Sequence, residues 1–386
     1  MSTEPTNTIS AASLSLSRAQ SVRPARSAKR IRVLVVDDSD LMRRQICDAL
    51  AEQADLEVVA TASDGVAALE MLETHCPDVI TLDLLMPRLG GLETLDEILR
   101  RRPMPVIVFS SLTQRAAQTT WEALERGAID YVPKPEGVAQ ARQILEGELP
   151  QKIRHMAGAN IELVLKYRKL RGRRVLSTAK PIDAPRPESP PAATQSCVAI
   201  GVSTGGPPAL SRLFAELNPP FPPIVIVQHM PALFTGPFAE RLNSIASLTV
   251  REARDGEPLQ PNVALVAPGG RHLKLRRRGD EVVTQIFDAE PVSGHRPSID
   301  VLMASAVACY GARCLGVIMT GMGRDGVEGC RQIRAAGGYV LGQDEASSDV
   351  YGMNKVAFVE GNVDRQVSLA RLADQMEAGI RRIAKN

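Results

Sequence analysis

Short apolar runs alternate with amphipathic stretches along most of this chain, and this alternation restricts the possible folds more than any other feature of the sequence. Between residues 31 and 150, runs such as "IRVLVV", "DVITLDLLM" and "MPVIVFSS" are each followed by a segment with helical periodicity. The alternation returns from residue 196 in "CVAIGV", "PPIVIVQHM" and "CLGVIMTGM". Strands and helices in strict succession are typical of a parallel sheet covered by helices on both faces.

The two regions are separated by a segment without apolar periodicity. It contains "AKPIDAPRPESPPAATQS", whose five prolines favour a semi-rigid linker. We therefore predict an α/β protein with two doubly wound parallel-sheet domains, residues 31–150 and 196–386, joined by a linker over residues 151–195. Residues 1–30 are rich in Ser, Ala and Arg and are predicted to be a disordered tail. A transit peptide is the alternative, although Glu4 argues against it.

Composition excludes several classes of protein. No apolar run approaches the roughly 20 residues that a membrane helix needs, so no membrane insertion is expected. The formal net charge of +2 provides no general attraction to nucleic acid. The six cysteines are scattered without a C-x-x-C pair, which argues against a disulfide framework or a zinc site and favours a reducing cytoplasm.

Polar side chains end four of the predicted strands in the first region. Asp37 and Asp38 follow "VLVV", and Asp83 ends "VITL". Because the carboxyl ends of parallel strands meet at one edge of a sheet, these acids should lie together. Like charges at one place favour a hard cation with oxygen ligands, so the sequence predicts a Mg²⁺ site. Ser110 and Lys134 bring a hydroxyl and an ammonium group to the same edge, where they can hold a phosphoryl group.

The stretches "VVDDSDLMRRQ", "TLDLLMPRLGGLE", "FSSLT" and "GAIDYVPKP" resemble the receiver domain of two-component response regulators, over residues 31–137. The resemblance implies a flavodoxin-like fold in which Asp83 accepts a phosphoryl group. The implied Mg²⁺ ligands are Asp37, Asp38, Asp83 and the backbone carbonyl of Leu85. Ser110 and Lys134 would contact the phosphoryl group, and Tyr131 would be the aromatic residue that reports the switch.

A serine among glycines, in "GVSTGG", stands between the apolar run "CVAI" and a helical segment. Such a strand-to-helix turn suits a nucleophile, an anion site or a plain tight turn. A nucleophilic Ser203 needs a base, and of the five histidines only His229 ends a continuous apolar strand. Asp325, just beyond a third strand, would orient the imidazole, and the N–H of Met322 is available to an oxyanion. The chain order of these residues disfavours a lipase-like hydrolase.

Longer stretches of the second region carry a second resemblance. "AIGVSTGGPPAL", "VIVQHMP", "APGGRHLKL", "HRPSIDVL", "VIMTGMGRDGVEG" and "QDEASSDVYGMNKVA" resemble the catalytic domain of chemotaxis protein-glutamate methylesterases, the CheB family, over about residues 196–384. The resemblance implies a Rossmann-like domain that needs no cofactor at its esterase site. The implied triad is Ser203, His229 and Asp325. Thr204 and Met322 match positions that shape the active site and the oxyanion hole, and Asn354 departs from the proline that is usual in "YGMP".

The two resemblances together imply a phosphorylation-activated hydrolase. It would demethylate glutamate methyl esters on chemoreceptors, deamidate receptor glutamines, and receive its phosphoryl group from a chemotaxis histidine kinase. The unphosphorylated receiver would cover the catalytic edge. Two alternatives stay open: a phosphorylation-switched scaffold, and a response regulator that binds nucleic acid through "KYRKLRGRR", which has six basic residues in nine. Because no helix-turn-helix pattern follows this run, we expect no specific nucleic-acid partner.

Overall fold

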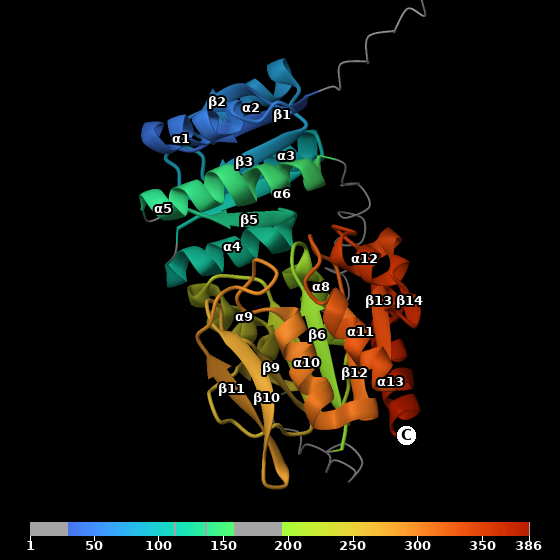
Figure 1. Ribbon diagram of the computed structural model, residues 1–386. Helices are drawn as coiled ribbons and strands as arrows, with labels where there is room; N and C mark the ends of the chain where they lie inside the picture. Colours follow the sequence, from blue (N-terminus) through green and yellow to red (C-terminus); the bar gives the residue numbers. More distant parts are fainter. Residues whose placement is uncertain (1–29, 112, 136, 158–194, 386) are drawn as a thin grey trace, which may run out of the picture.

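The computed structural model describes residues 30–111, 113–135, 137–157 and 195–385 of the chain. The described residues form two α/β domains, stacked one on the other (Figure 1). The predicted tail up to residue 29 lies outside the described residues, as does the predicted linker from residue 158 to 194 with its basic run. Within the described part, no helix has the length and apolarity needed to cross a bilayer.

The first domain is a five-stranded parallel sheet of order β2-β1-β3-β4-β5, as in a doubly wound fold. Its strands are β1 (Ile31–Val36), β2 (Leu56–Ala62), β3 (Val79–Asp83), β4 (Val106–Ser110) and β5 (Asp130–Pro133). Four helices alternate with them: α1 (Asp40–Ala51), α2 (Gly65–His75), α3 (Gly91–Arg101) and α4 (Gln114–Arg126). Leu34 and Val36 of β1 pack in one apolar cluster and Val33 and Val35 in another, so both faces of the sheet are buried.

The helical end of the first domain extends beyond the predicted boundary at residue 150. Helix α5 (Val138–Ala141) continues into a π-helical stretch, η1 (Arg142–Glu148), and then into α6 (Leu149–Met156). Leu149, Ile153 and Met156 recur with helical spacing and are buried in the apolar cluster of the first domain. Residues 151–156 therefore belong to the first domain and not to the linker, because their apolar stripe is buried against that domain.

The second domain is a seven-stranded sheet of order β14-β13-β12-β6-β7-β9-β8, again parallel throughout. Its strands are β6 (Cys197–Val202), β7 (Ile224–Gln228), β8 (Thr249–Glu252), β9 (Val263–Val266), β12 (Cys314–Ile318), β13 (Tyr339–Gln343) and β14 (Arg365–Val367). The predicted hairpin is confirmed as the antiparallel pair β10 (His272–Arg278) and β11 (Glu281–Phe287). The fold class predicted from the alternating pattern is therefore correct for both domains.

Helices cover both faces of the second sheet. They are α8 (Gly206–Glu216), α9 (Ala232–Ile245), α10 (Ile299–Tyr310), α11 (Val327–Ala335), α12 (Met353–Val359) and α13 (Leu372–Ile383), with short 3₁₀ turns η3 (Gly311–Arg313), η4 (Glu345–Ser347) and η5 (Leu369–Arg371). Alternate residues of β6 face opposite clusters, since Val198 and Ile200 pack with α8 and α9 while Cys197 and Ala199 pack with α10. The continuous apolar runs of the sequence reflect this burial on both faces.

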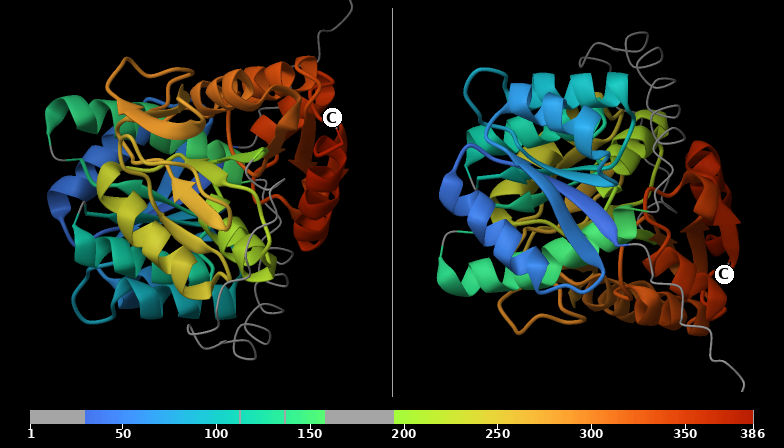
Figure 2. Two further views of the ribbon diagram at one scale, coloured as in Figure 1. Left: turned by 90° about the horizontal axis from the view of Figure 1, so that it is seen from below. Right: turned by 90° about the horizontal axis from the view of Figure 1, so that it is seen from above.

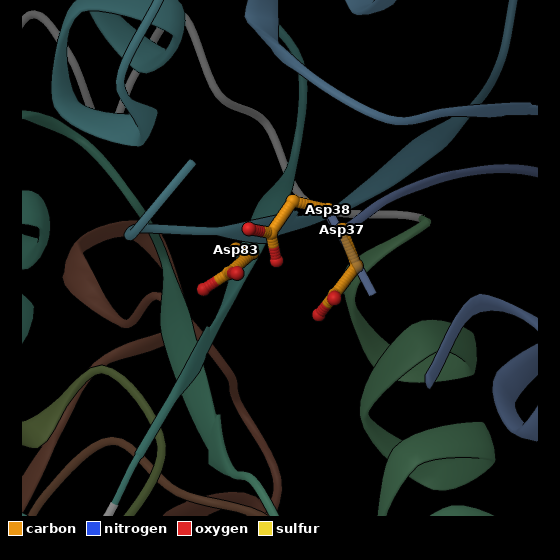
Figure 3. Close-up of side chains that lie close together, drawn as sticks. All are labelled: Asp37, Asp38 and Asp83. Carbon is orange, nitrogen blue, oxygen red and sulfur yellow. The ribbon is translucent and has the colours of Figure 1, made fainter. Parts of the chain in front are cut away.

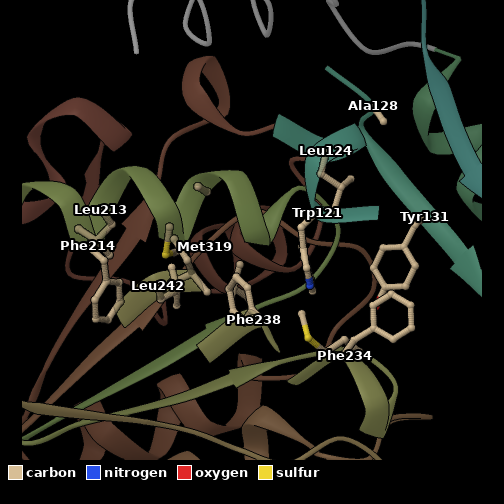
Figure 4. Close-up of a cluster of buried hydrophobic side chains, with 14 of the residues drawn as sticks. Trp121, Leu124, Ala128, Tyr131, Leu213, Phe214, Phe234, Phe238, Leu242 and Met319 are labelled. Carbon is tan, nitrogen blue, oxygen red and sulfur yellow. The ribbon is translucent and has the colours of Figure 1, made fainter. Parts of the chain in front are cut away.

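The two domains share one apolar cluster. Helix α4 contacts α8 and α9, and the Trp121 ring stacks on Phe238 with centroids 5.1 Å apart. Tyr131 of β5 stacks on Phe234 at 5.0 Å (Figure 4). Seen from above, the red C-terminal elements stand beside the first domain rather than beneath it (Figure 2). The first domain thus packs on one side of the second domain through its α4 and β5 elements.

Candidate active site and acid cluster

Asp37, Asp38 and Asp83 gather at the carboxyl ends of the neighbouring strands β1 and β3 (Figure 3). Each offers a carboxylate oxygen, and these three atoms all lie within 4.8 Å of one another. Asp37 and Asp83 are buried, whereas Asp38 is exposed. A group of carboxylates that is open to water on one side matches the ligands that Mg²⁺ prefers, so the donor set fits the predicted metal.

Lys134 follows β5 and reaches the acid cluster. Its Nζ lies 2.8 Å from Oδ2 of Asp83 and 2.9 Å from Oδ2 of Asp37. Burial opposes the charge of Lys134, but its bonds to the two carboxylates outweigh burial and raise its pKa. Burial is the largest influence on Asp83 and raises the pKa of this carboxyl despite the nearby ammonium. Asp83 is therefore a poorly hydrated carboxylate beside a cation.

The other residues predicted for this site lie at its margin. Ser110 ends β4, and its hydroxyl accepts a hydrogen bond from Thr120 Oγ1 at 2.6 Å, which directs it toward α4. The N–H of Leu85 donates to Oδ1 of Asp83 at 3.2 Å. Tyr131 is buried at the contact between the two domains, where its ring stacks on Phe234. A change in the position of β5 would therefore alter its packing against the second domain directly.

Ser203, His229 and Asp325 follow three neighbouring strands of the second sheet, β6, β7 and β12. Nδ1 of His229 lies 3.2 Å from Oγ of Ser203. Nε2 of the same ring lies 2.8 Å from Oδ2 of Asp325. The structure thus brings the three side chains into one hydrogen-bonded chain at the edge where the sheet changes winding direction, which is where ligands bind in such folds.

The surroundings of Asp325 determine which nitrogen of His229 carries the proton. The carboxylate also accepts hydrogen bonds from the Ser298 hydroxyl at 2.7 Å, the Ile299 N–H at 2.7 Å and the Asp300 N–H at 3.1 Å. Burial opposes ionisation of Asp325, but the bonds from His229 and from these groups outweigh burial and lower its pKa. An ionised Asp325 accepts a hydrogen bond from Nε2–H and keeps the proton on that nitrogen, so Nδ1 directs its lone pair at Ser203, as a general base must.

The turn that carries Ser203 is held by neighbouring strands. The Ser203 N–H donates to Thr320 O at 3.0 Å, and Gln228 Nε2 donates to Ser203 O at 2.9 Å. Gly205 has a φ of +75°, a left-handed conformation that glycine adopts without strain. Gly321 packs so closely that a Cβ there would lie 2.7 Å from the Cβ of Ser203. Gly205 therefore allows the tight turn after Ser203, and Gly321 allows the opposing turn to approach the serine closely.

The backbone of Ser203 is already engaged, so an oxyanion needs donors from other residues. Thr204 is buried directly after the serine, and its carbonyl accepts a hydrogen bond from Thr320 Oγ1 at 2.9 Å. Met322 follows Gly321 on the opposing turn. Within the described chain, no hydrogen bond occupies the backbone N–H of Thr204 or of Met322. Both N–H groups can therefore donate to an oxyanion beside Ser203.

Sequence reasoning missed several residues that shape this site. Ser298 is the N-cap of α10, which its type and position before an apolar run could have indicated. Its bond to Asp325 could not be read from the pattern, nor could the contact of His295 with His229. Gln228, at the end of β7, bridges the backbone carbonyls of Ser203 and His229 at 2.9 and 3.1 Å.

Asn354, the departure from the family pattern, lies outside the triad. It is fully buried in the first turn of α12. Its Nδ2 donates to Gln343 O and to Ser348 Oγ, both at 2.8 Å. Proline could make neither bond, so asparagine ties α12 to the end of β13 in a way that is open only to a side chain with donors.

Comparisons with known proteins relate both domains to described families. Residues 198–376 match the family model described as CheB methylesterase, and residues 33–146 match the response regulator receiver domain. The chain is 42% identical to a protein-glutamate methylesterase/protein-glutamine glutaminase of Pectobacterium atrosepticum, covering 91% of this chain and 97% of that protein. It is 44% identical to protein-glutamate methylesterase/protein-glutamine glutaminase 4 of Anaeromyxobacter dehalogenans, covering 92% of this chain and 96% of that protein. The crystal structure of the Thermotoga maritima CheB methylesterase catalytic domain is 37% identical, with a TM-score of 0.46 and coverage of 47% of this chain and 96% of that chain.

Proposed function

This chain belongs to the CheB methylesterase family, with a response regulator receiver domain ahead of its catalytic domain, and from that premise we propose the residues that perform and control its hydrolase reaction. It is a phosphorylation-activated protein-glutamate methylesterase and protein-glutamine glutaminase. We assign the catalytic domain to residues 196–386 and the receiver to the region from residue 31 to α6. The observation that carries the assignment of the triad is the hydrogen-bonded chain from Ser203 through His229 to Asp325.

The proposed reaction begins when Oγ of Ser203 attacks the carbonyl carbon of a glutamate methyl ester. Nδ1 of His229 takes the hydroxyl proton, and the N–H groups of Thr204 and Met322 stabilise the oxyanion. The tetrahedral intermediate collapses, the C–O bond to the methoxy group breaks, and methanol leaves with the proton from Nδ1. Water, deprotonated by Nδ1, then attacks the acyl-enzyme and releases the glutamate side chain and Ser203. Throughout, Asp325 holds the proton on Nε2.

A glutamine side chain fits the same scheme. Its amide carbonyl passes through the same tetrahedral arrangement, and ammonia leaves in place of methanol with the proton from His229 Nδ1. The acyl-enzyme is then identical to that formed from the ester. One triad therefore accounts for both activities in the names of the relatives.

The receiver controls this site through Asp83, the proposed phosphoacceptor. An oxygen of Asp83 attacks the phosphorus of the donor, and the donor's leaving group departs. Lys134 already lies 2.8 Å from Asp83, which places it to stabilise the added charge, and Ser110 would turn from α4 toward the phosphoryl group. Mg²⁺, when bound, neutralises negative charge around the transferred group. The residues that would hold it are Asp37, Asp38, Asp83 and the carbonyl of Leu85.

The proposed partners follow from the two domains. The substrate is a methyl-accepting chemoreceptor, and the phosphodonor is a chemotaxis histidine kinase. The contacts of α4 with α8 and α9, and of Tyr131 in β5 with Phe234 in α9, support inhibition by the unphosphorylated receiver, because they tie the receiver to the helices that follow β6 and β7. Phosphorylation of Asp83 would favour an open arrangement.

The test is methanol release from methylated chemoreceptor membranes, with and without acetyl phosphate and Mg²⁺. We expect release to rise with the phosphodonor in the wild-type protein and to be lost in Ser203→Ala. Asn354→Ala is the matched control, since it changes a buried residue of the same domain outside the triad. Full activity in Ser203→Ala would overturn the nucleophile assignment. No release from a verified substrate under either condition would favour the phosphorylation-switched scaffold instead.

A further inference from the structure

A short segment between β11 and α10 runs beside both the base and the acid of the proposed triad. Val292 and His295 pair through backbone hydrogen bonds of 3.1 and 3.0 Å, around a tight turn in which Ser293 and Gly294 have positive φ angles of 53° and 79°. The segment continues to Ser298, which caps α10 and donates to Asp325. We call residues 292–300 the clamp segment.

His295 of the clamp segment lies face to face with the catalytic base. The ring centroids of His229 and His295 are 3.8 Å apart, and the ring planes differ by 13°. An imidazole makes its hydrogen bonds in the plane of the ring, and both bonds of His229 are already directed at Ser203 and Asp325. The stacked ring therefore covers a surface of His229 that these bonds leave exposed, and it opposes rotation of His229 out of their plane.

The His295 ring is uncharged at neutral pH. Burial, and then the neighbouring His229, lower the pKa of His295 to about 4, against the opposing influence of Asp325. Two further charged groups act on it from the receiver: Glu148 favours its protonation and Lys152 disfavours it. The clamp segment thus presents a neutral aromatic face to a base that gains a positive charge in the reaction.

This charge gives the stack a role that a simple packing contact lacks. Before Ser203 attacks, His229 is neutral and the stack joins two neutral rings. After the proton transfer, the imidazolium lies against an aromatic face, and a desolvated contact of this kind is attractive. An interaction that strengthens as the transition state forms lowers the barrier, whereas one of constant strength does not.

We propose that His295 is a positioning residue for the general base: its ring fixes the plane of His229 and stabilises the imidazolium formed during hydrolysis. The proposal rests on the proposed function, because it takes His229 as the base. The same segment supplies Ser298 and the Ile299 N–H to Asp325, so residues 292–300 orient both the base and the acid.

The test compares His295→Ala, His295→Phe and His295→Lys in the full-length protein, with methanol release measured in the presence of acetyl phosphate and Mg²⁺. His295→Ala should lower kcat about tenfold, while KM stays within about twofold because the proposed role of the ring is to position His229 and not to bind substrate. His295→Phe restores a flat aromatic face and should bring kcat to within about threefold of the wild type.

His295→Lys places a cation beside His229. The acid limb of the pH profile of kcat/KM should then move to lower pH, because a nearby positive charge disfavours the imidazolium. His295→Phe should leave this limb in place. Thermal melting and phosphorylation of Asp83 check the fold of each variant, and if His295→Ala fails to fold, the contrast between the phenylalanine and lysine variants still decides the question.

Three results would overturn the inference: an unchanged kcat in His295→Ala, a change in KM alone, or a His295→Phe variant as slow as His295→Ala. The last result would assign the role to the ring nitrogens instead of the ring face. Failure of the proposed function gives a different pattern, since Ser203→Ala would then stay active. Loss of activity in Ser203→Ala together with an unaffected His295→Ala rejects only the role of His295.

Discussion

Replacing Trp121 by alanine is expected to raise the esterase activity of the unphosphorylated protein. Trp121 belongs to α4 of the receiver and is buried at the contact with the catalytic domain. Its ring stacks on Phe238 with centroids 5.1 Å apart and meets Phe234 edge-on at 6.1 Å. Both partners belong to α9, so these two ring contacts join the domains and are lost when the domains separate.

The magnitude follows from these two contacts. An aromatic pair contributes about 0.5–1.5 kcal/mol beyond its buried area, so losing two pairs weakens the closed arrangement by about 1–3 kcal/mol. This corresponds to a rise of about 5- to 150-fold in the ratio of open to closed molecules. While the closed form predominates, the basal rate rises by the same factor, up to the rate of the phosphorylated protein.

The assay is methanol release from methylated receptor membranes without a phosphodonor. Trp121→Phe is the matched control, because it keeps an aromatic ring and should raise the basal rate less. Glu125→Ala removes an exposed ion pair with Arg241, 2.6 Å long, across the same interface, and should raise the rate by less than about fivefold. If Trp121→Ala still accepts a phosphoryl group and its basal rate is unchanged, the interface is not inhibitory. A protein lacking residues 1–195 that is no faster than the intact one would lead to the same conclusion.

Three further predictions concern the receiver and the acids of the catalytic domain. Asp83→Asn, or chelation of Mg²⁺ by EDTA, should abolish the rise in methanol release on addition of acetyl phosphate; a persistent rise would place the phosphoacceptor elsewhere. Lys152→Met should lower the free energy of unfolding in urea by about 3–5 kcal/mol, because it leaves buried Asp130, 2.9 Å from the ammonium, without its cation; an unchanged midpoint would contradict this. Burial, with the nearby charge of Asp325, raises the pKa of Asp300 to about 6, so the folded state retains a proton that the unfolded state releases, and stability falls as pH rises toward and through that value. Asp300→Asn should flatten this part of the melting profile, and an equally steep fall in the variant would assign it to another group.

Much of the fold and of both sites could be predicted from the chain itself. Ser203, His229 and Asp325 each follow an apolar run, and parallel strands present their carboxyl ends at one edge, so their convergence required no coordinates. The same reasoning placed Asp37 and Asp83 together. These predictions succeed because hydrophobic periodicity and the position of a residue at a strand end are local properties of the sequence.

Other features depend on contacts between segments that are distant in the sequence. The bond from His229 to Asp325 joins residues 96 positions apart, and the geometry of that bond determines which ring nitrogen faces the serine. The engagement of the Ser203 N–H by Thr320, which leaves the oxyanion to other donors, is likewise invisible in a strand-and-turn pattern. The sequence pattern predicts a linker over residues 151–156, whereas their apolar stripe packs into the receiver.

The pattern of residues along the chain suffices to predict the two parallel-sheet domains and the residue types at their sheet edges, because burial on both faces of a sheet imposes continuous apolar runs that end at those residues. The stacking of His295 on His229, and of Tyr131 on Phe234 across the domain interface, depends on tertiary packing. A ring's orientation results from the packing of every element around it, and no local periodicity of the chain records that packing.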